Sequence, residues 1–135
     1  MVVDIDALEF SDQHLYELKG KPFSGTAREN YPSGKTYMEM VIVDGIQEGV
    51  TKEWYETGAL RSEAFYKKGG LHGSYIEWFE NGQLKRTSYY EFDILISMEE
   101  KNEEGKVIDK YELSPNSIEH QTLTVARRLD KKSRS

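Results

Sequence analysis

The stretch IEWFENGQLK, residues 76–85, places aromatic and charged residues on both sides of an Asn-Gly pair. Nearly the same arrangement occurs upstream as KEWYETGALR, residues 52–61, again with a Trp followed by a second aromatic residue. An Asn-Gly pair between two runs of strand-forming residues is typical of a β-hairpin. The chain therefore contains at least two similar hairpins, and their spacing indicates the fold.

The two hairpins belong to a repeat with a period of 24 residues. Internal repeats of this length are typical of proteins in which each unit stacks on the next. The columns that recur at this spacing are Gly25, Gly49 and Gly73; Gly34, Gly58 and Gly82; and Tyr31, Tyr55 and Phe79. We therefore expect a mainly all-β fold, an elongated single-layer antiparallel β-meander built from hairpin units of about 24 residues.

The pairing inside each hairpin follows from the turn. A two-residue type I′ turn at Asn81-Gly82 requires positive φ at both residues, and it would place Phe79 opposite Leu84 and Trp78 opposite Lys85. The same rule predicts Trp54 opposite Arg61, and it predicts three opposite-charge pairs, which are Arg28–Glu39, Lys52–Glu63 and Glu77–Arg86. Cross-strand pairs of these kinds stabilise antiparallel sheets by about 0.2–1 kcal/mol each.

Adjacent aromatic residues serve different faces of such a sheet, because successive side chains in a strand point to opposite sides. One predicted face collects Tyr31, Met38, Met40, Ile42, Tyr55, Leu60, Tyr66, Phe79, Leu84 and Tyr90. The other collects Tyr37, Val41, Val43, Val50, Trp54, Phe65, Ile76, Trp78 and Tyr89. A longer turn would reassign these faces. An aromatic stripe left partly exposed on either face would suit a binding surface.

The repeat pattern divides the chain into a repeat domain, residues 1–113, and a C-terminal segment, residues 114–135. Full units are expected near 25–48, 49–72 and 73–96, with degenerate units at both ends. The first degenerate unit would include a hairpin at residues 9–16, and the last would place Gly105 under Gly82 after one deletion.

The C-terminal segment fits two interpretations. Ile118, Thr122, Val125 and Leu129 share one helical face, with Ser117 as a candidate N-cap, whereas Leu123 and Val125 alternate as in a strand. A short capping helix followed by a basic tail is the favoured expectation.

Charge is distributed unevenly. Of 18 basic and 24 acidic side chains, residues 114–135 hold five and two, which leaves 13 and 22 in the repeat domain and a net charge of −9 there. An acidic body disfavours nucleic acid, for which phosphate neutralisation dominates affinity, and disfavours anionic membranes. It suits a basic protein partner. The start MVVDIDALEF lacks a signal-peptide pattern and no membrane span is apparent, so we expect a cytoplasmic protein.

Patterns for catalysis or cofactor binding are missing from the sequence. There is no cysteine, and His14, His72 and His120 lack metal-ligand spacing, with His72 expected at an exposed turn. Glu29, Glu53 and Glu77 recur in register but are expected to form a solvated charge ladder. No phosphate-binding loop or nucleophile elbow is present. We expect no enzyme activity, no cofactor and no metal.

The segments YPSGK, WYETGALRSEAFYKKGGLHG and WFENGQLKRTSYY together resemble MORN-repeat variants, and more narrowly the YwqK-type antitoxin and immunity family. The resemblance covers about residues 23–92. It implies an extended antiparallel sheet and neutralisation of a cognate bacterial toxin by direct binding. It implies no particular binding residues.

We expect function where the repeats diverge. The candidate partner-binding residues are Tyr89, Tyr90, Glu91, Phe92, Asp93, Glu99, Glu100, Glu103 and Glu104, together with Trp54 and Trp78. Acidic residues beside aromatic ones would suit a basic toxin, such as a nuclease or a deaminase-like enzyme. The alternative function is a MORN-type scaffold or membrane-associated interaction module. Edge strands at both ends of the sheet would allow homo-oligomers.

Overall fold

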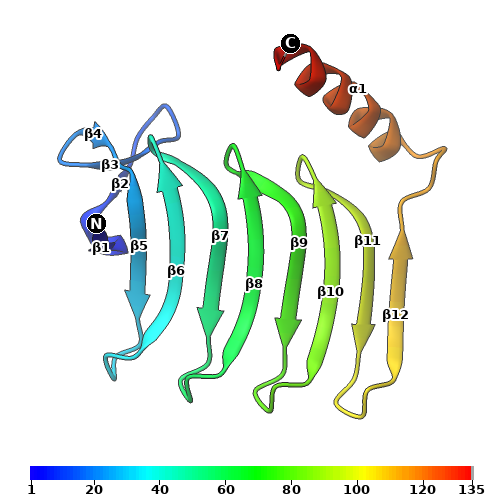
Figure 1. Cartoon of the computed structure of the whole chain (residues 1–135), viewed down its shortest axis with the longest axis horizontal. Coiled ribbons are helices and arrows are strands. Elements are labelled where there is room, and N and C mark those ends of the chain that lie inside the picture. Colours follow the sequence, from blue (N-terminus) through cyan, green and yellow to red (C-terminus); the bar gives the residue numbers. More distant parts are fainter. Residues whose placement is uncertain (135) are drawn as a thin grey trace.

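A computed structural model describes residues 1–134. Its main feature is a nine-stranded sheet in the order β1-β5-β6-β7-β8-β9-β10-β11-β12 (Figure 1). From β5 onward every strand pairs antiparallel with its neighbour in sequence. The strands are β5 (Gly25–Asn30), β6 (Thr36–Val43), β7 (Ile46–Trp54), β8 (Leu60–Lys67), β9 (Gly70–Trp78), β10 (Leu84–Glu91), β11 (Ile94–Lys101) and β12 (Val107–Glu112). The predicted β-meander is therefore confirmed.

All three predicted charge pairs occur in the register. Arg28 lies opposite Glu39, Lys52 opposite Glu63, and Arg86 opposite Glu77. The Arg28–Glu39 ion pair is 2.7 Å long, whereas Lys52–Glu63 and Arg86–Glu77 are wider, at 3.9 and 3.7 Å.

The predicted type I′ turn at Asn81-Gly82 is wrong. Only Gly82 has positive φ, at 91°. The Gly82 amide donates to the Phe79 carbonyl at 2.9 Å, and the Phe79 amide donates to the Gln83 carbonyl at 2.8 Å. The loop is thus a type I turn followed by a left-handed glycine. The same two hydrogen bonds and a left-handed glycine recur at Gly34, Gly58 and Gly105, so the last degenerate hairpin forms as predicted.

This longer loop changes the pairs next to it. Trp78 lies opposite Leu84 and Trp54 opposite Leu60, and the ladders resume at Glu77–Arg86 and Glu53–Ser62. The skipped residues Lys85 and Arg61 sit in β-bulges, where an extra residue re-aims the chain. The predicted Trp–cation and Phe79–Leu84 pairs are therefore wrong. The cations lie instead over the following aromatic, with Arg61 5.3 Å from the Tyr55 ring centroid and Lys85 5.8 Å from that of Phe79.

Type I′ turns occur at the opposite end of the hairpins, in the links between repeats. Val43 pairs with Ile46, Lys67 with Gly70 and Glu91 with Ile94, so each link is a two-residue turn. Both turn residues have positive φ in all three links, which are Asp44-Gly45, Lys68-Gly69 and Phe92-Asp93. The strands therefore alternate between a five-residue loop at one end of the sheet and a tight turn at the other.

The N-terminal segment caps one face of the sheet. β1 (Val2–Asp4) pairs parallel with β5, and a 3₁₀ turn (Ile5–Ala7) follows it. β2 (Glu9–Phe10), β3 (Tyr16–Leu18) and β4 (Lys21–Pro22) form a separate three-stranded sheet. The predicted hairpin at residues 9–16 therefore forms, but it does not join the meander.

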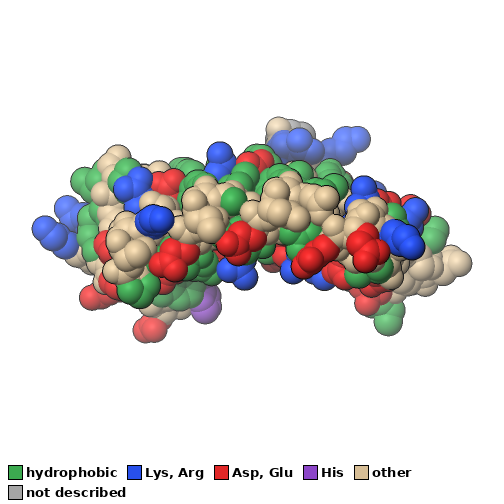
Figure 2. All heavy atoms as spheres, turned by 90° about the horizontal axis from the view of Figure 1, so that it is seen from below, with side chains coloured by type: hydrophobic (Ala, Val, Ile, Leu, Met, Phe, Trp, Pro, Cys, Tyr) green, Lys and Arg blue, Asp and Glu red, His purple; other side chains and the backbone are tan. Residues whose placement is uncertain are grey.

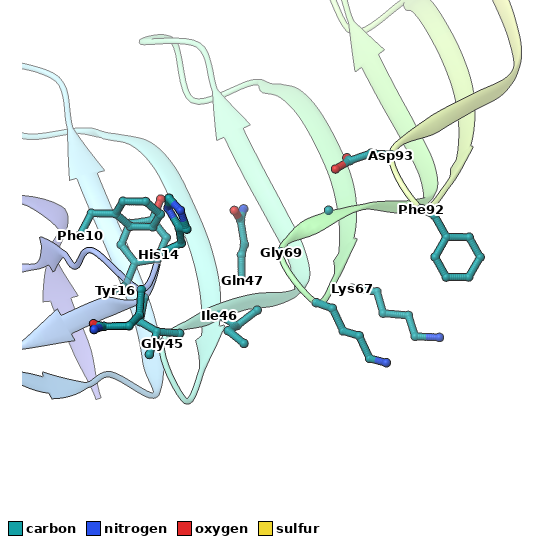
Figure 3. Close-up of a pocket in the computed structure, with 14 residues that line it drawn as sticks. Phe10, His14, Tyr16, Gly45, Ile46, Gln47, Lys67, Gly69, Phe92 and Asp93 are labelled. Carbon is teal, nitrogen blue, oxygen red and sulfur yellow. The ribbon is translucent and has the colours of Figure 1, made fainter. Parts of the chain in front are cut away.

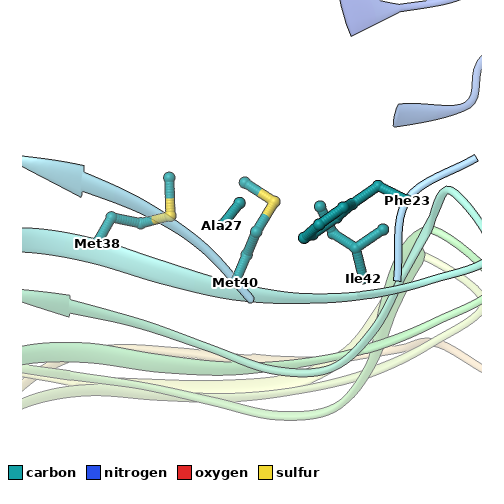
Figure 4. Packing of buried hydrophobic residues seen from close by; sticks show 5 residues of the cluster. All are labelled: Phe23, Ala27, Met38, Met40 and Ile42. Atoms are coloured by element: carbon teal, nitrogen blue, oxygen red, sulfur yellow. The ribbon is translucent and has the colours of Figure 1, made fainter. Parts of the chain in front are cut away.

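The hydrophobic core lies under this N-terminal segment. Phe23, Ala27, Met38, Met40 and Ile42 are buried together on one side of the sheet (Figure 4). Val3, Ile5, Leu8, Tyr16 and Leu18 pack against them. The core is thus concentrated at the first strands, and the later strands form a thinner layer.

The C-terminal segment forms the helix α1 (Ile118–Ser133), which resolves the alternative between helix and strand. The Ser117 hydroxyl accepts a hydrogen bond from the His120 amide at 3.1 Å, as expected of an N-cap. The helix face that carries Ile118 and Leu129 is not the buried one, because Ile118 is 77% exposed and Leu129 59%, whereas Leu123 is 1% exposed. Ion pairs from Asp130 to Lys67 and from Arg127 to Glu91 bind the other side of the helix to the link turns.

Candidate interaction surface

The strand register assigns side chains to two faces of the sheet. The face that carries Trp54, Phe65, Trp78 and Tyr89 is called the tryptophan face, and the face that carries Met40, Ala64, Tyr75 and Ser88 is called the methionine face. Register partners on the methionine face run Met40–Thr51–Ala64–Tyr75–Ser88–Met98. The N-terminal segment packs on the methionine face, where its residues contact the cluster of Ala27, Met38, Met40 and Ile42.

The tryptophan face is hollowed beside Trp54. A groove of about 460 Å³ is lined by Arg28, Lys35, Glu39, Trp54 and Thr57. The Arg28–Glu39 ion pair forms one wall and the half-buried indole forms another. Such a groove combines apolar surface with paired charges, as protein interfaces do.

A second groove on the same face, of about 370 Å³, surrounds Tyr89. Tyr89 is 44% exposed and lies between Ser74 and Ser97 on the neighbouring strands. Because serine side chains are small, they do not cover the Tyr89 ring. Glu99 and Lys110 form an ion pair of 3.6 Å beside it. An exposed tyrosine with adjacent charges is a typical anchor for a protein partner.

The predicted site residues are divided among four places. Trp54, Trp78, Tyr89 and Glu99 share the tryptophan face, so this part of the prediction forms one surface. Tyr90 and Glu100 point to the methionine face. Glu91, Phe92 and Asp93 lie at the link-turn end, and Glu103 and Glu104 lie in the last hairpin loop.

On the methionine face, Glu100 is part of an ionic chain. Arg86 binds both Glu100 and Glu77, and its hydrogen bond to Glu100 raises the pKa of the guanidinium further. Glu53 accepts from the Ser62 hydroxyl at 3.0 Å and from the Tyr37 hydroxyl at 3.3 Å. These carboxylates therefore have partners inside the sheet, and the expected solvated charge ladder is partly an internal network.

The tyrosines beside these carboxylates are resistant to ionisation. Burial, followed by the negative charges of Glu77 and Glu53, raises the pKa of Tyr75 to about 12. Burial and then the charge of Asp93 raise the pKa of Tyr66. The charge of Glu53 is the main cause of the raised pKa of Tyr37. The methionine face thus holds neutral hydroxyls, which suit structure better than acid–base chemistry.

At the link-turn end, Phe92 and Asp93 have structural partners. The Phe92 amide donates to His72 Nδ1 at 3.1 Å. The rings of Phe92 and His72 pack edge-on, with their centroids 4.8 Å apart. The Leu71 amide donates to Asp93 Oδ1 at 2.6 Å. His72 is therefore half-buried and bonded, which corrects the expectation of an exposed turn histidine.

His72 is one of three side chains that accept the same hydrogen bond in successive repeats, a feature that was not predicted from the sequence. The first residue of each link turn donates its amide to a side chain 20 residues earlier, Asp44 to Ser24, Lys68 to Glu48 and Phe92 to His72. The period of 24 residues was the signal that could have revealed it. The acceptor differs in each copy because only its position is required.

A third groove, of about 540 Å³, crosses the link turns. Phe10, His14 and Tyr16 gather at one end of it, and Lys67 and Phe92 lie at the other (Figure 3). This groove contains Phe92 and Asp93 but is separate from the tryptophan face.

The hairpin-loop end of the sheet is acidic. Figure 2 looks onto this end and shows acidic side chains recurring across the molecule. Glu56, Glu80 and Glu103 occupy the same position in successive loops, and all three are exposed. Glu104 extends this row, so the predicted acidic residues of the last loop belong to a repeated feature.

Among residues 1–134, no three His, Asp or Glu side chains are placed to hold a metal ion. In the same part of the chain, no helix combines the length and apolar character needed to cross a membrane.

Comparison with known families supports the repeat assignment. The family model described as MORN repeat variant matches residues 47–68 and 71–92. These hairpins resemble MORN repeats. The matched segments coincide with the β7–β8 and β9–β10 hairpins. No curated protein and no solved structure gives a significant match. The MORN-type repeats indicate a β-repeat module for binding or scaffolding.

Proposed function

We propose that this chain is a non-enzymatic binding protein whose tryptophan face binds a basic protein. The observation that carries the proposal is the open face itself, which holds Trp54, Trp78 and Tyr89 and on which Trp54 and Tyr89 border grooves lined by charged pairs. The opposite face is occupied by the N-terminal segment and by internal ion pairs. An aromatic anchor in a groove with a charged rim is the usual composition of an interface hot spot.

The partner that fits best is a cognate bacterial toxin with a basic substrate-binding surface, such as a nuclease or a deaminase-like enzyme. The repeat domain has a net charge of −9, which would steer a basic protein toward it and raise the association rate. Binding would occlude the substrate surface of the toxin. The chain would then act as an immunity protein or antitoxin in the cytoplasm.

The second candidate is a MORN-type scaffold that associates with membranes. Helix α1 favours it, because Arg127, Arg128, Lys131 and Lys132 place basic side chains on an otherwise acidic molecule. Such a cluster would attract anionic lipids. Glu91 forms an ion pair with Arg127 of this cluster, which reduces its free charge.

The test is binding to a toxin domain encoded beside this chain's gene, measured by calorimetry and by inhibition of toxin activity. Trp78→Ala and Tyr89→Ala should each weaken binding roughly tenfold or more. Tyr90→Phe is the matched control, because Tyr90 is adjacent in sequence but faces the other side. Unchanged binding by both alanine variants would exclude the tryptophan face.

A second arm separates the two candidates. Glu99→Lys on the tryptophan face should weaken toxin binding more than Glu104→Lys in the hairpin loop, because only Glu99 borders the Tyr89 groove. Binding to vesicles of phosphatidylcholine and phosphatidylserine in the absence of any protein would favour the scaffold. That binding should then be lost on Arg128→Glu.

A further inference from the structure

β12 is a free edge of the nine-stranded sheet. Among residues 1–134 it pairs only with β11, and all six of its residues, Val107–Glu112, are exposed. The opposite edge is β1, which has three residues. Short edge strands are one way in which proteins limit edge-to-edge pairing, and β12 is longer. Figure 1 shows the outer side of β12 open along its length, with the connection to α1 leaving beyond its C-terminal end.

The hydrogen-bonding pattern identifies which backbone groups of β12 face outward. The Leu113 amide donates to the Ile96 carbonyl at 2.8 Å, and the register continues as Met98–Tyr111 and Glu100–Asp109. Hydrogen-bonded pairs alternate along an antiparallel ladder, so Leu113, Tyr111 and Asp109 bond inward to β11. Lys110 and Glu112 therefore direct their backbone N–H and C=O groups away from the sheet.

We propose that the β12 edge pairs antiparallel with β12 of a second copy, in a register that places Lys110 opposite Glu112 of the second copy. The two-fold axis then passes between the two copies of Tyr111, and the Lys110–Glu112 pair occurs twice. In an antiparallel pairing, a residue whose backbone N–H and C=O groups point outward must lie opposite another such residue. The neighbouring registers would set Lys110 opposite Lys110 or Glu112 opposite Glu112, and like charges directly opposite are destabilising. Charge thus selects one register.

Side chains on both faces agree with this register. Lys110 and Glu112 lie on the tryptophan face, beside Glu99, whereas Tyr111 lies on the methionine face opposite Met98. The paired strands would therefore form two ion pairs on one side and a tyrosine–tyrosine contact on the other. Both are favourable cross-strand contacts. The consequence is one continuous sheet in which the two tryptophan faces lie side by side.

The full-length chain tests the proposal in analytical ultracentrifugation over a range of concentrations. The wild type should show a concentration-dependent dimer. Glu112→Lys leaves the Lys110–Glu99 ion pair in place and sets Lys opposite Lys twice, so it should weaken dimerisation roughly tenfold. Lys110→Glu should act in the same direction.

The charge exchange is the decisive variant. Lys110→Glu combined with Glu112→Lys reverses both charges, restores opposite pairs in the same register, and should recover most of the wild-type dimer. Lys52→Glu is the matched control, because it breaks a ladder ion pair inside the sheet and should leave dimerisation unchanged. Circular dichroism of each variant reports whether the fold is intact.

Two results would overturn the proposal. The first is a wild type that remains monomeric at every concentration. The second is a charge exchange that dimerises as weakly as the single reversals. Neither result depends on the binding of a toxin, so the proposed function can fail or hold independently.

Discussion

At the scale of single residues, the repeated Trp–aromatic pair has a structural purpose. The Tyr31 hydroxyl donates to the Trp54 carbonyl, and the Tyr55 hydroxyl donates to the Trp78 carbonyl, both at 2.7 Å. Each tyrosine thus reaches across to the equivalent strand of the next unit. The third member of the column is Phe79, which has no hydroxyl, so the series ends where the last full unit ends.

Tyr55→Phe tests this link between units. It removes one hydrogen bond and leaves the Trp78 carbonyl without this donor, so the free energy of unfolding should fall by about 1 kcal/mol. Urea denaturation measures the change. Tyr75→Phe at neutral pH is the control and should have a much smaller effect, because the Tyr75 hydroxyl makes no hydrogen bond within residues 1–134. Equal losses in the two variants would contradict the assignment.

Tyr75 itself predicts a dependence of stability on alkaline pH. Its pKa rises from 10.0 in the unfolded chain to about 12 in the fold. Below pH 10 the group is neutral in both states. As the pH rises from about 10 to about 12 the unfolded chain ionises first, so the free energy of unfolding should fall. Tyr75→Phe should show a shallower fall in denaturation at stepped pH. Identical slopes for wild type and variant would contradict this account.

At the scale of elements, the link turns show how neighbouring copies adjust to each other. In the second link, Gly69 lies beside Ile46, whose methyl group is 3.7 Å from the site of a Cβ. In the third link the sizes are exchanged, because Asp93 replaces the glycine and Gly70 replaces the isoleucine. A Cβ at Gly70 would lie 2.7 Å from Asp93 Oδ2. The hydrogen bond from Leu71 holds that carboxylate in place.

Gly70→Ala should therefore destabilise the protein by about 1–3 kcal/mol, as overpacking does. The same substitution in an Asp93→Gly background should cost much less, because the carboxylate is gone. A double-mutant cycle based on denaturation measures the coupling between the two sites. Additive effects would show that the two residues do not meet.

The helix α1 gives a second test at this scale. Leu123→Ala should lower the free energy of unfolding by about 2 kcal/mol or more, because the side chain is buried. Leu129→Ala should change it by less than about 0.5 kcal/mol, because the side chain is exposed. The reverse ranking would indicate that the helix packs through the face that carries Ile118, Val125 and Leu129.

These elements also show what the sequence could and could not predict. The 24-residue period predicted the antiparallel strands from β5 to β12, their order and the charge pairs, because periodicity and side-chain alternation are local properties, whereas the parallel pairing of β1 with β5 was not predicted. The type of the hairpin turn was predicted wrongly and the type of the link turn was not predicted, because Asn81-Gly82 and Lys68-Gly69 both supply a glycine and only the hydrogen bonds distinguish them. The buried side of α1 was not identified, because Asp130 and Arg127 on that side pair with Lys67 and Glu91, which are far away in sequence. The groove around Tyr89 depends on Ser74 and Ser97, whose proximity follows only from the register.

At the scale of the whole molecule, the core is confined to one end. Phe23, Met40 and Ile42 are buried under the N-terminal segment, whereas every residue of β12 is exposed. A stack in which units contact only their neighbours has stability that varies along its length. The proposed binding face extends from the well-packed end to the thinly packed end.

Hydrogen exchange should reveal this gradient. Amides of β6 and β7 should exchange most slowly, and those of β12 most rapidly, under native conditions. Exchange measured by NMR or mass spectrometry checks the order. Uniform protection from β5 to β12 would show that the sheet opens as one cooperative unit.

Because the same hydrogen bonds recur between successive units, the length of the sheet can change by whole units. The Tyr55 hydroxyl bonds to the next unit, and the link-turn amides bond to the preceding one. A duplicate of residues 49–72 inserted directly after His72 would therefore find a partner for each of these hydrogen bonds. Each added unit contributes two strands and would lengthen the sheet by about 10 Å. The chain can therefore be matched to surfaces of different width by adding or removing whole units, without redesigning any single contact.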